Sequence, residues 1–167
     1  MAYRNKTYVA FDADNDIRYY YLMRAWKQND NTNFNFHDAH GIRPSKKWSS
    51  EETIKQNLRE RLKNSKMFIC LIGEHTRYMY KFVRWEIETA IKLGIPRIGC
   101  NLNGFRGVDT ERCPPILRES LSLHVSYNNS IIQYALEDWG SDHWQKQRQK
   151  KTGGFYYKPS VYEKLGL

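Results

Sequence analysis

The feature that most constrains the fold is an uninterrupted apolar run, MFICLIG, at residues 67–73. The run has the length of a β-strand, and its apolar side chains on both faces need cover on both sides, as in the central strand of a parallel sheet. Amphipathic helical patterns flank it at residues 51–64 and 80–93. A strand enclosed by two helices in this way predicts an α/β fold with right-handed crossovers.

The same alternation of short strands and helices extends along the rest of the chain. Strands are expected at 6–11, 33–38, 67–73, 95–102 and 123–127. Helices are expected at 16–27, 51–64, 80–93, in a short segment starting at Pro114-Pro115, and from about 130 to 144. This order predicts a three-layer α/β sandwich, in which a central five-stranded parallel sheet has helices on both faces. Functional sites of such folds lie beyond the carboxyl ends of the strands, here at 11–16, 38–48, 73–80 and 101–112.

Composition limits the possible functions. The 167 residues carry 27 Lys and Arg against 18 Asp and Glu, and this net charge of +9 predicts an anionic partner. No apolar run reaches the roughly 20 residues of a membrane span, and the first residues lack a secretory signal, so we expect a cytoplasmic protein. Cys70, Cys100 and Cys113 form no CxxC pair, which favours reduced thiols. Cys70 and Cys100 lie inside apolar runs, where burial is expected.

Several common catalytic and metal-binding patterns are missing from the sequence. It contains no GxGxxG after the first strand, no Walker A motif and no GxSxG motif. His37, Asp38 and His40 resemble a metal-ligand cluster, but the usual third ligand is not evident, and we expect no metal and no cofactor. Asp14 and Asp16 are explained by the preference for negative charge at a helix N-terminus.

Glu86 is the most informative acidic residue. In the helix expected at 80–93 it lies on the flank of an apolar stripe formed by Val83, Ile87, Ala90 and Ile91. A carboxylate at that edge, soon after a strand end, is expected to be partly desolvated, which raises its pKa. Glu88 lies further round the helix and is expected to be solvated. The alternative for Glu86 is an ion pair with Arg84 or Lys81 on a solvated face.

Four segments carry a family pattern in the order of the expected elements. They read KTYVAF-DADND, FHDAHG, SKMFICLIGEHT and RYMYKFVRWEIETAIKLGIPRIGCNLNG, and the most specific part is the run from Phe82 to Ile87. With these segments, residues 5–130 resemble the TIR-like family, a flavodoxin-like group that includes the TIR proteins of bacterial Thoeris antiphage systems. The resemblance implies a TIR-like domain at 1–145 and a basic, aromatic C-terminal extension at 146–167.

The resemblance also implies an activity. TIR domains that cleave NAD⁺ carry their catalytic glutamate on this helix, which puts that role on Glu86. The implied substrate-binding residues are Phe11, Asp12, Asp38, His40, Trp48 and Phe82. Nicotinamide is already a cationic leaving group, so one carboxylate that stabilises an oxocarbenium-like ribose is sufficient. Attack by water gives ADP-ribose, and attack within the molecule gives a cyclic ADP-ribose isomer. NAD⁺ is then a substrate, and the implied partners are further copies of the chain and an effector that senses the product.

Two other functions stay open at the level of sequence. TIR domains also act as non-catalytic interaction modules, so the fold alone does not establish catalysis. A nucleic-acid-binding domain would use basic and aromatic residues of the C-terminal stretch, namely Lys146, Arg148, Lys150, Lys151, Lys158, Phe155, Tyr156 and Tyr157. Packing of these aromatic rings on the domain is the competing explanation, and we do not expect nucleic acid to be the partner.

Overall fold

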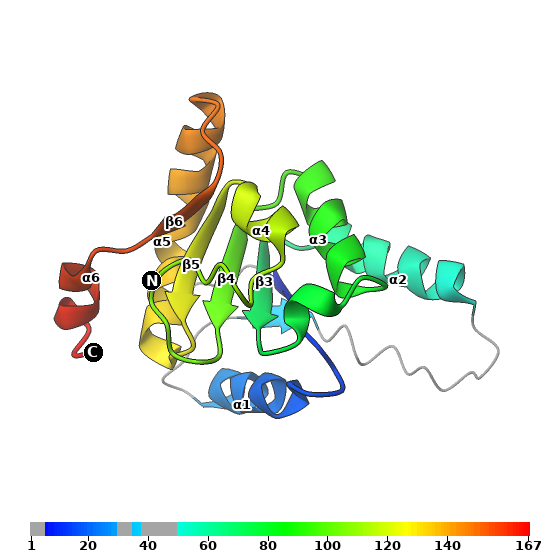
Figure 1. Cartoon of the computed structure of the whole chain (residues 1–167), viewed down its shortest axis with the longest axis horizontal. Helices are drawn as coiled ribbons and strands as arrows, with labels where there is room; N and C mark the ends of the chain where they lie inside the picture. The colour runs from blue at the N-terminus through cyan, green and yellow to red at the C-terminus, as the bar shows by residue number, and fades with distance from the viewer. Residues whose placement is uncertain (1–5, 30–34, 38–49) are drawn as a thin grey trace.

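A computed structural model describes residues 6–29, 35–37 and 50–167. Its centre is one parallel sheet with the strand order β2-β1-β3-β4-β5-β6 (Figure 1). The strands are β1 (Lys6–Ala10), β2 (Asn35–His37), β3 (Met67–Ile72), β4 (Arg97–Asn101), β5 (Ser122–Ser126) and β6 (Gly154–Tyr156). All five strand pairs are parallel, so the carboxyl ends of the strands meet at one edge of the sheet. The predicted parallel α/β architecture is confirmed.

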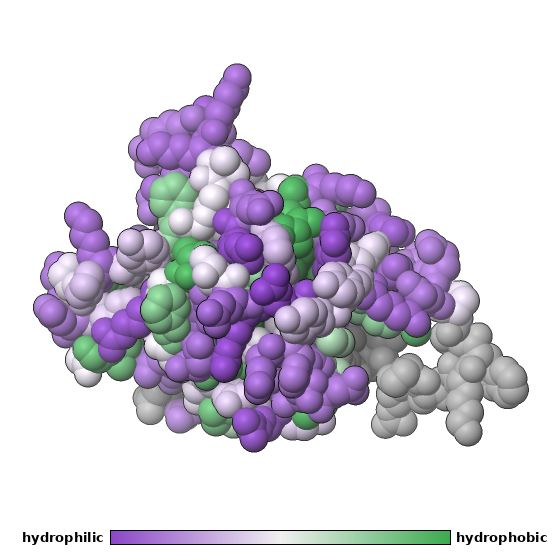
Figure 2. Space-filling view, viewed as in Figure 1, coloured by the Kyte–Doolittle hydropathy of each residue, from purple (hydrophilic) through white to green (hydrophobic). Residues whose placement is uncertain are grey.

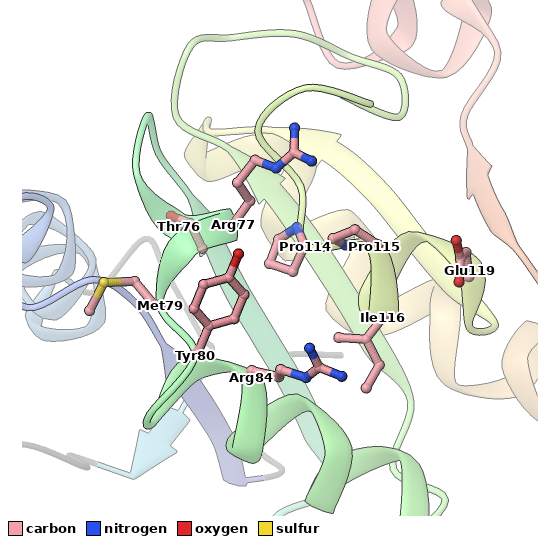
Figure 3. Close-up of a pocket in the computed structure, with 9 residues that line it drawn as sticks. All are labelled: Thr76, Arg77, Met79, Tyr80, Arg84, Pro114, Pro115, Ile116 and Glu119. Carbon is pink, nitrogen blue, oxygen red and sulfur yellow. The ribbon is translucent and has the colours of Figure 1, made fainter.

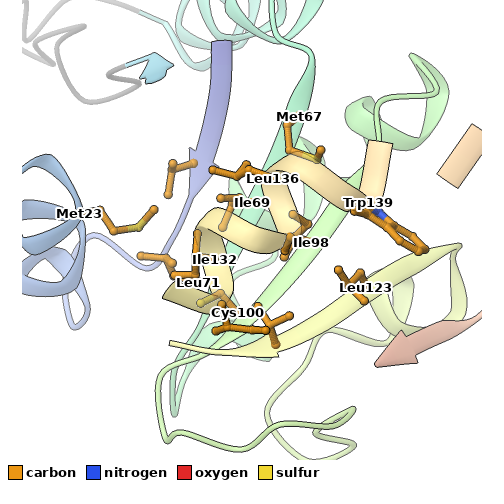
Figure 4. Packing of buried hydrophobic residues seen from close by; sticks show 14 of the residues in the cluster. Met23, Met67, Ile69, Leu71, Ile98, Cys100, Leu123, Ile132, Leu136 and Trp139 are labelled. Carbon is orange, nitrogen blue, oxygen red and sulfur yellow. The ribbon is translucent and has the colours of Figure 1, made fainter. Parts of the chain in front are cut away.

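Helices cover both faces of this sheet. They are α1 (Ile17–Gln28), α2 (Glu51–Lys63), α3 (Val83–Lys92), α4 (Pro115–Glu119), α5 (Asn129–Arg148) and α6 (Pro159–Lys164), with a short 3₁₀ helix η2 at Thr76–Tyr78. On one face, α1 and α5 enclose the first core cluster, where Met23 and Trp139 lie over strand residues such as Ile69 and Leu123 (Figure 4).

The opposite face is covered by α2, α3 and α4. Leu58 and Leu62 of α2 and Ile87 of α3 are buried there, in a second core cluster with side chains from this face of β1 and β3. Because side chains alternate along a strand, Tyr8 and Ala10 of β1 belong to this second cluster, and their neighbours Val9 and Phe11 belong to the first. Helix α2 begins at a capped end, where the Ser50 side chain accepts a hydrogen bond of 3.1 Å from the backbone N–H of Thr53.

The C-terminal extension is part of the same sheet. Strand β6 pairs with β5, aligning Phe155 with Leu123, and Tyr162 of α6 is fully buried in the first core cluster. The structure therefore adds one strand to the five predicted, because β6 has only three residues and begins at the second glycine of the Gly153-Gly154 pair. The expected boundary at 145/146 falls inside α5, which runs on to Arg148.

All three cysteines are buried and free thiols. Burial was predicted for Cys70 and Cys100 from their apolar runs, and Cys113 is buried as well. No helix in the described ranges combines the length and apolar character that crossing a membrane requires, and those ranges hold no group of three or more His, Cys, Asp or Glu side chains placed to bind a metal ion. The visible face in Figure 2 is mainly hydrophilic, with apolar residues in small separate areas.

Candidate functional site

Glu86 lies in the first turn of α3 and faces the sheet. The helix begins at Val83 rather than at residue 80, and the backbone N–H of Glu86 donates to the carbonyl oxygen of Phe82 at 2.8 Å. The residue is only 7% exposed, with Val83 and Ile87 of the same helix buried beside it. The predicted apolar stripe is confirmed, and the burial of Glu86 is more complete than the partial desolvation expected from the helical pattern.

The carboxyl group of Glu86 has a specific partner across the chain. The hydroxyl of Tyr8, in the middle of β1, donates a hydrogen bond to Glu86 Oε2. Tyr8 is fully buried, and its ring stacks on Phe68 of β3 with a centroid separation of 5.8 Å. The stacking fixes the ring and aims its hydroxyl at α3. Tyr8 was not predicted from the sequence. The alternation of side chains along β1 puts Tyr8 and Phe11 on opposite faces of the sheet, and this pattern could have identified Tyr8 as the residue on the α3 side.

Burial controls the electrostatics of this pair. Removal from water raises the pKa of Glu86 to about 8, and the hydrogen bond from Tyr8 opposes part of that rise. The pKa of Tyr8 is raised well above its ordinary value by burial and by the Glu86 charge. In the ligand-free protein at neutral pH, Glu86 is therefore mostly protonated, and a bound positive charge would favour its ionised form.

The ion-pair alternative for Glu86 is wrong. Arg84 binds Glu88, with Nε and Oε1 3.1 Å apart, and Lys81 pairs with Glu51 at 3.5 Å. Both contacts are exposed, and the prediction that Glu88 is solvated is confirmed by its 38% exposed side chain. The two acids of α3, two residues apart, thus occupy opposite environments.

The other predicted binding residues are not all brought to Glu86. Phe11 is buried on the opposite face of the sheet, where its ring stacks on Tyr20 at 4.7 Å. Asp12 is fully buried, and it accepts hydrogen bonds from the backbone of Asp14 at 3.1 Å and from the Asn15 amide at 2.7 Å, so its oxygens shape the turn after β1. Phe82, the N-cap residue of α3 four positions before Glu86, packs against the second core cluster.

The remaining predicted residues lie outside the described part of the chain. These are Asp38, His40 and Trp48, and the side chain of His37 falls there too. The predicted roles of Asp38, His40 and Trp48 in substrate binding stay predictions, as does the expectation that His37, Asp38 and His40 bind no metal.

A cavity of about 190 Å³ opens at the carboxyl ends of β1, β3 and β4. Asp16 and Arg18 reach it from the start of α1, Gly73 from the end of β3, and Asn103 and Arg112 from the loop after β4. The neighbouring strands β1 and β3 lead to helices on opposite faces, so this edge is the topological switch point of the sheet, where open α/β folds bind ligands. Its location agrees with the strand ends identified in the sequence.

A second cavity, of about 380 Å³, lies between the segment before α3 and the start of α4 (Figure 3). The Tyr80 ring stands between the Arg77 and Arg84 side chains and faces Pro114. Arg77 donates to the carbonyl oxygen of Glu111 at 2.9 Å, which ties this segment to the β4–α4 loop. Glu86 lines neither this cavity nor the one at the strand ends.

Comparison with known proteins identifies the family. The family model for the TIR-like domain of the Thoeris protein ThsB matches residues 8–106, more than half of the chain. The chain belongs to the ThsB TIR-like family. The matched range includes both Tyr8 and Glu86, and the C-terminal extension of this TIR-like protein lies beyond it.

Three solved structures are similar to this ThsB-type domain at low sequence identity. A conserved protein from Enterococcus faecalis V583 is 17% identical with a TM-score of 0.50, and the match covers 98% of both chains. A 2-deoxyribosyltransferase from Bacillus psychrosaccharolyticus is 19% identical with a TM-score of 0.45, over 57% of this chain and 72% of that one. A 2-desoxiribosyltransferase from Leishmania mexicana is 16% identical with a TM-score of 0.42, over 58% of this chain and 64% of that one. At these identities the likeness concerns the fold alone.

Proposed function

We propose that this TIR-like domain cleaves the N-glycosidic bond between nicotinamide and ribose in NAD⁺, with Glu86 as the catalytic carboxylate. The product is a cyclic ADP-ribose isomer or a related nucleotide messenger that serves Thoeris antiphage defence. The observation that carries the proposal is the buried Glu86 in the first turn of α3, hydrogen-bonded to Tyr8. Membership of the ThsB family supports the biological setting.

The reaction suits a single carboxylate. The bond between ribose C1′ and the nicotinamide nitrogen breaks, and its electron pair leaves with nicotinamide, which becomes neutral. Water or a ribose hydroxyl of the same nucleotide then forms the new bond to C1′ and releases its proton to solvent. A ring nitrogen of the adenine forms the bond with its lone pair instead, and the base takes up the positive charge. The positive charge that develops on the ribose is stabilised by a nearby carboxylate, and the effect is large because the site excludes water.

The protonation state of Glu86 follows from the substrate's charge. The nicotinamide ring of NAD⁺ is cationic, and a cation within a few ångströms of a buried carboxyl lowers its pKa. Binding therefore converts the neutral Glu86 of the free protein into the charged form that stabilises the ribose cation. Tyr8, which already donates to Oε2, positions the carboxyl group through both states.

Activity in this setting implies two partners. Further copies of the chain complete the site by self-association, and a separate effector protein senses the nucleotide product. Both proposals follow from the Thoeris context of the family.

The test is incubation of the protein with NAD⁺, followed by chromatography with mass detection of nicotinamide and nucleotide products. We expect Glu86→Gln to lower nicotinamide release by about 100-fold or more, as the loss of a transition-state contact does. Glu88→Gln is the matched control, because it makes the same change two residues away on the exposed side of the helix. The assay is repeated in lysate from phage-challenged cells, where a trigger is present.

The competing function is a non-catalytic interaction module. If neither the purified protein nor the challenged lysate releases nicotinamide, and Glu86→Gln retains full protection against phage, catalysis is excluded and the module is the better description. Equal loss of activity in Glu86→Gln and Glu88→Gln would also contradict the assigned role.

A further inference from the structure

The cavity at the carboxyl ends of β1, β3 and β4 holds an acidic group for which the described chain provides no donor. Asp16 is only 7% exposed, and its Oδ2 atom is buried with no hydrogen-bond partner among the described residues. It occupies the N-cap position of α1 but makes no side-chain capping hydrogen bond there. A buried unsatisfied acceptor costs roughly 1–3 kcal/mol, so a ligand hydroxyl or a water that donates to Oδ2 would recover that cost.

The end of β3 is shaped to receive this carboxyl group. A Cβ atom at Gly73 would come within 2.7 Å of the carboxyl carbon of Asp16, which is closer than real Cβ contacts. Only glycine leaves room for Asp16 at this point. The carboxylate is therefore held against the strand end, at the wall of the cavity, rather than directed into solvent.

Two arginines line the same cavity and balance the negative charge of Asp16 and of Glu74, which also lines it. Arg18 extends from the first turn of α1, where its guanidinium lies 4.9 Å from the centre of the Tyr19 ring. Arg112 is placed by its backbone N–H, which donates to Asp109 Oδ1 at 2.9 Å. Both arginines oppose the rise that burial and Asp12 produce in the pKa of Asp16.

This combination of groups matches a phosphorylated sugar. A guanidinium binds phosphate oxygens through paired N–H donors, and a buried carboxylate oxygen accepts from a hydroxyl group. The cavity volume of about 190 Å³ is below the range of about 300–1,000 Å³ that holds a drug-sized ligand. It therefore fits one part of a nucleotide rather than a whole dinucleotide.

We infer that this cavity is the subsite for a phosphorylated ribose of the dinucleotide, in which Asp16 accepts a hydrogen bond from a ribose hydroxyl and Arg18 and Arg112 bind the phosphate. The inference rests on the proposed function for its choice of a dinucleotide. It adds a ribose-phosphate site and three binding residues that lie away from the Glu86–Tyr8 pair.

Calorimetric titration of the whole chain with ADP-ribose tests the subsite without requiring turnover. We expect Arg112→Gln to weaken binding by about tenfold, because one charge-assisted phosphate contact is lost. Arg106→Gln is the matched control: it removes the same charge from the same loop, but its side chain stacks on Tyr162, 4.3 Å from the ring centre. We expect this control to bind within about twofold of wild type.

Asp16→Asn separates the sugar contact from the phosphate contact. The change should weaken ADP-ribose binding but leave inorganic pyrophosphate binding unchanged or tighter, because it removes a negative charge beside the anion. Far-ultraviolet circular dichroism and thermal unfolding check that each variant folds. If Asp16→Asn does not fold, Arg18→Gln and Arg112→Gln decide the outcome.

The results distinguish this inference from the proposed function. Failure of ADP-ribose to bind, or binding to all cavity variants as tightly as to wild type, overturns the subsite. Binding that depends on Asp16 and Arg112 in a protein that never consumes NAD⁺ upholds the subsite and contradicts the proposed catalysis.

Discussion

The buried, protonated Glu86 makes a prediction about stability that does not depend on activity. Its pKa is 4.5 as an ordinary glutamate and about 8 in the folded protein. Between these values the folded state binds more protons at this residue than the unfolded state, so the free energy of unfolding falls as pH rises. Over the whole interval the effect is about 5 kcal/mol, at 1.36 kcal/mol for each pH unit.

Glu86→Gln removes this pH dependence, because a glutamine amide of the same shape does not titrate. Between pH 6 and pH 8 we expect the wild-type protein to lose about 2 kcal/mol of unfolding free energy relative to the variant. For a chain of this length that difference corresponds to about 4–8 °C in the midpoint of thermal unfolding. All other titrating groups, including the five histidines, are shared by both proteins and cancel in the comparison.

Urea denaturation at both pH values, with linear extrapolation to water, measures the difference. Glu88→Gln is the control, and its stability relative to wild type should stay constant within about 0.5 kcal/mol, as for other exposed substitutions. If the difference between wild type and Glu86→Gln does not change with pH, the description of Glu86 as a neutral, buried acid is refuted.

Four further predictions follow from the same contacts. With NAD⁺ as substrate, kcat/KM should rise with pH up to about pH 8, because the ionised form of Glu86 is the active one. The rate of nicotinamide release measures this, and a kcat/KM that does not change with pH would contradict it. Tyr8→Phe removes the hydrogen bond that lowers the Glu86 pKa, so the same profile should move to higher pH, and an unmoved midpoint argues against the contact. Gly73→Ala should cost roughly 1–3 kcal/mol in urea denaturation, because the new methyl group overlaps Asp16, whereas a neutral result would show that Asp16 has room to move. Tyr162→Ala should lower the free energy of unfolding by about 3–5 kcal/mol, because it removes a fully buried ring. Tyr162→Phe should lower it by about 1 kcal/mol, because only the acceptor for the Ser126 N–H at 3.2 Å is lost. Small effects of both substitutions would mean that the C-terminal extension is not part of the core.

The sheet shows how far local sequence patterns reach. The run that became Met67–Ile72 predicted a central parallel strand because burial on both faces leaves no polar position in it. Strand β6 was missed because three residues carry too little periodicity to be recognised. Its existence depends on pairing with β5, which is about 30 residues earlier in the chain, and no local pattern records that contact.

The candidate site shows the limit more clearly. The apolar stripe of α3 predicted that Glu86 lies at the edge of a buried face, and its environment is indeed apolar. Its partner Tyr8 is 78 positions away in the chain, so no local pattern joins the two. Phe11 was predicted to line the same site, but the alternation along β1 puts it on the opposite face of the sheet from Tyr8.

The sequence by itself determined the element order, the parallel sheet, the family and the position of Glu86 on its helix, because each of these follows from periodicity or from residues adjacent in the chain. The tertiary structure decided which groups meet: Tyr8 with Glu86, Asp16 with the glycine at the end of β3, and Tyr162 with the core. These contacts set the pKa of Glu86 and leave Asp16 Oδ2 without a hydrogen-bond donor among the described residues. Both effects arise from desolvation, which depends on the packing of distant segments rather than on any one of them.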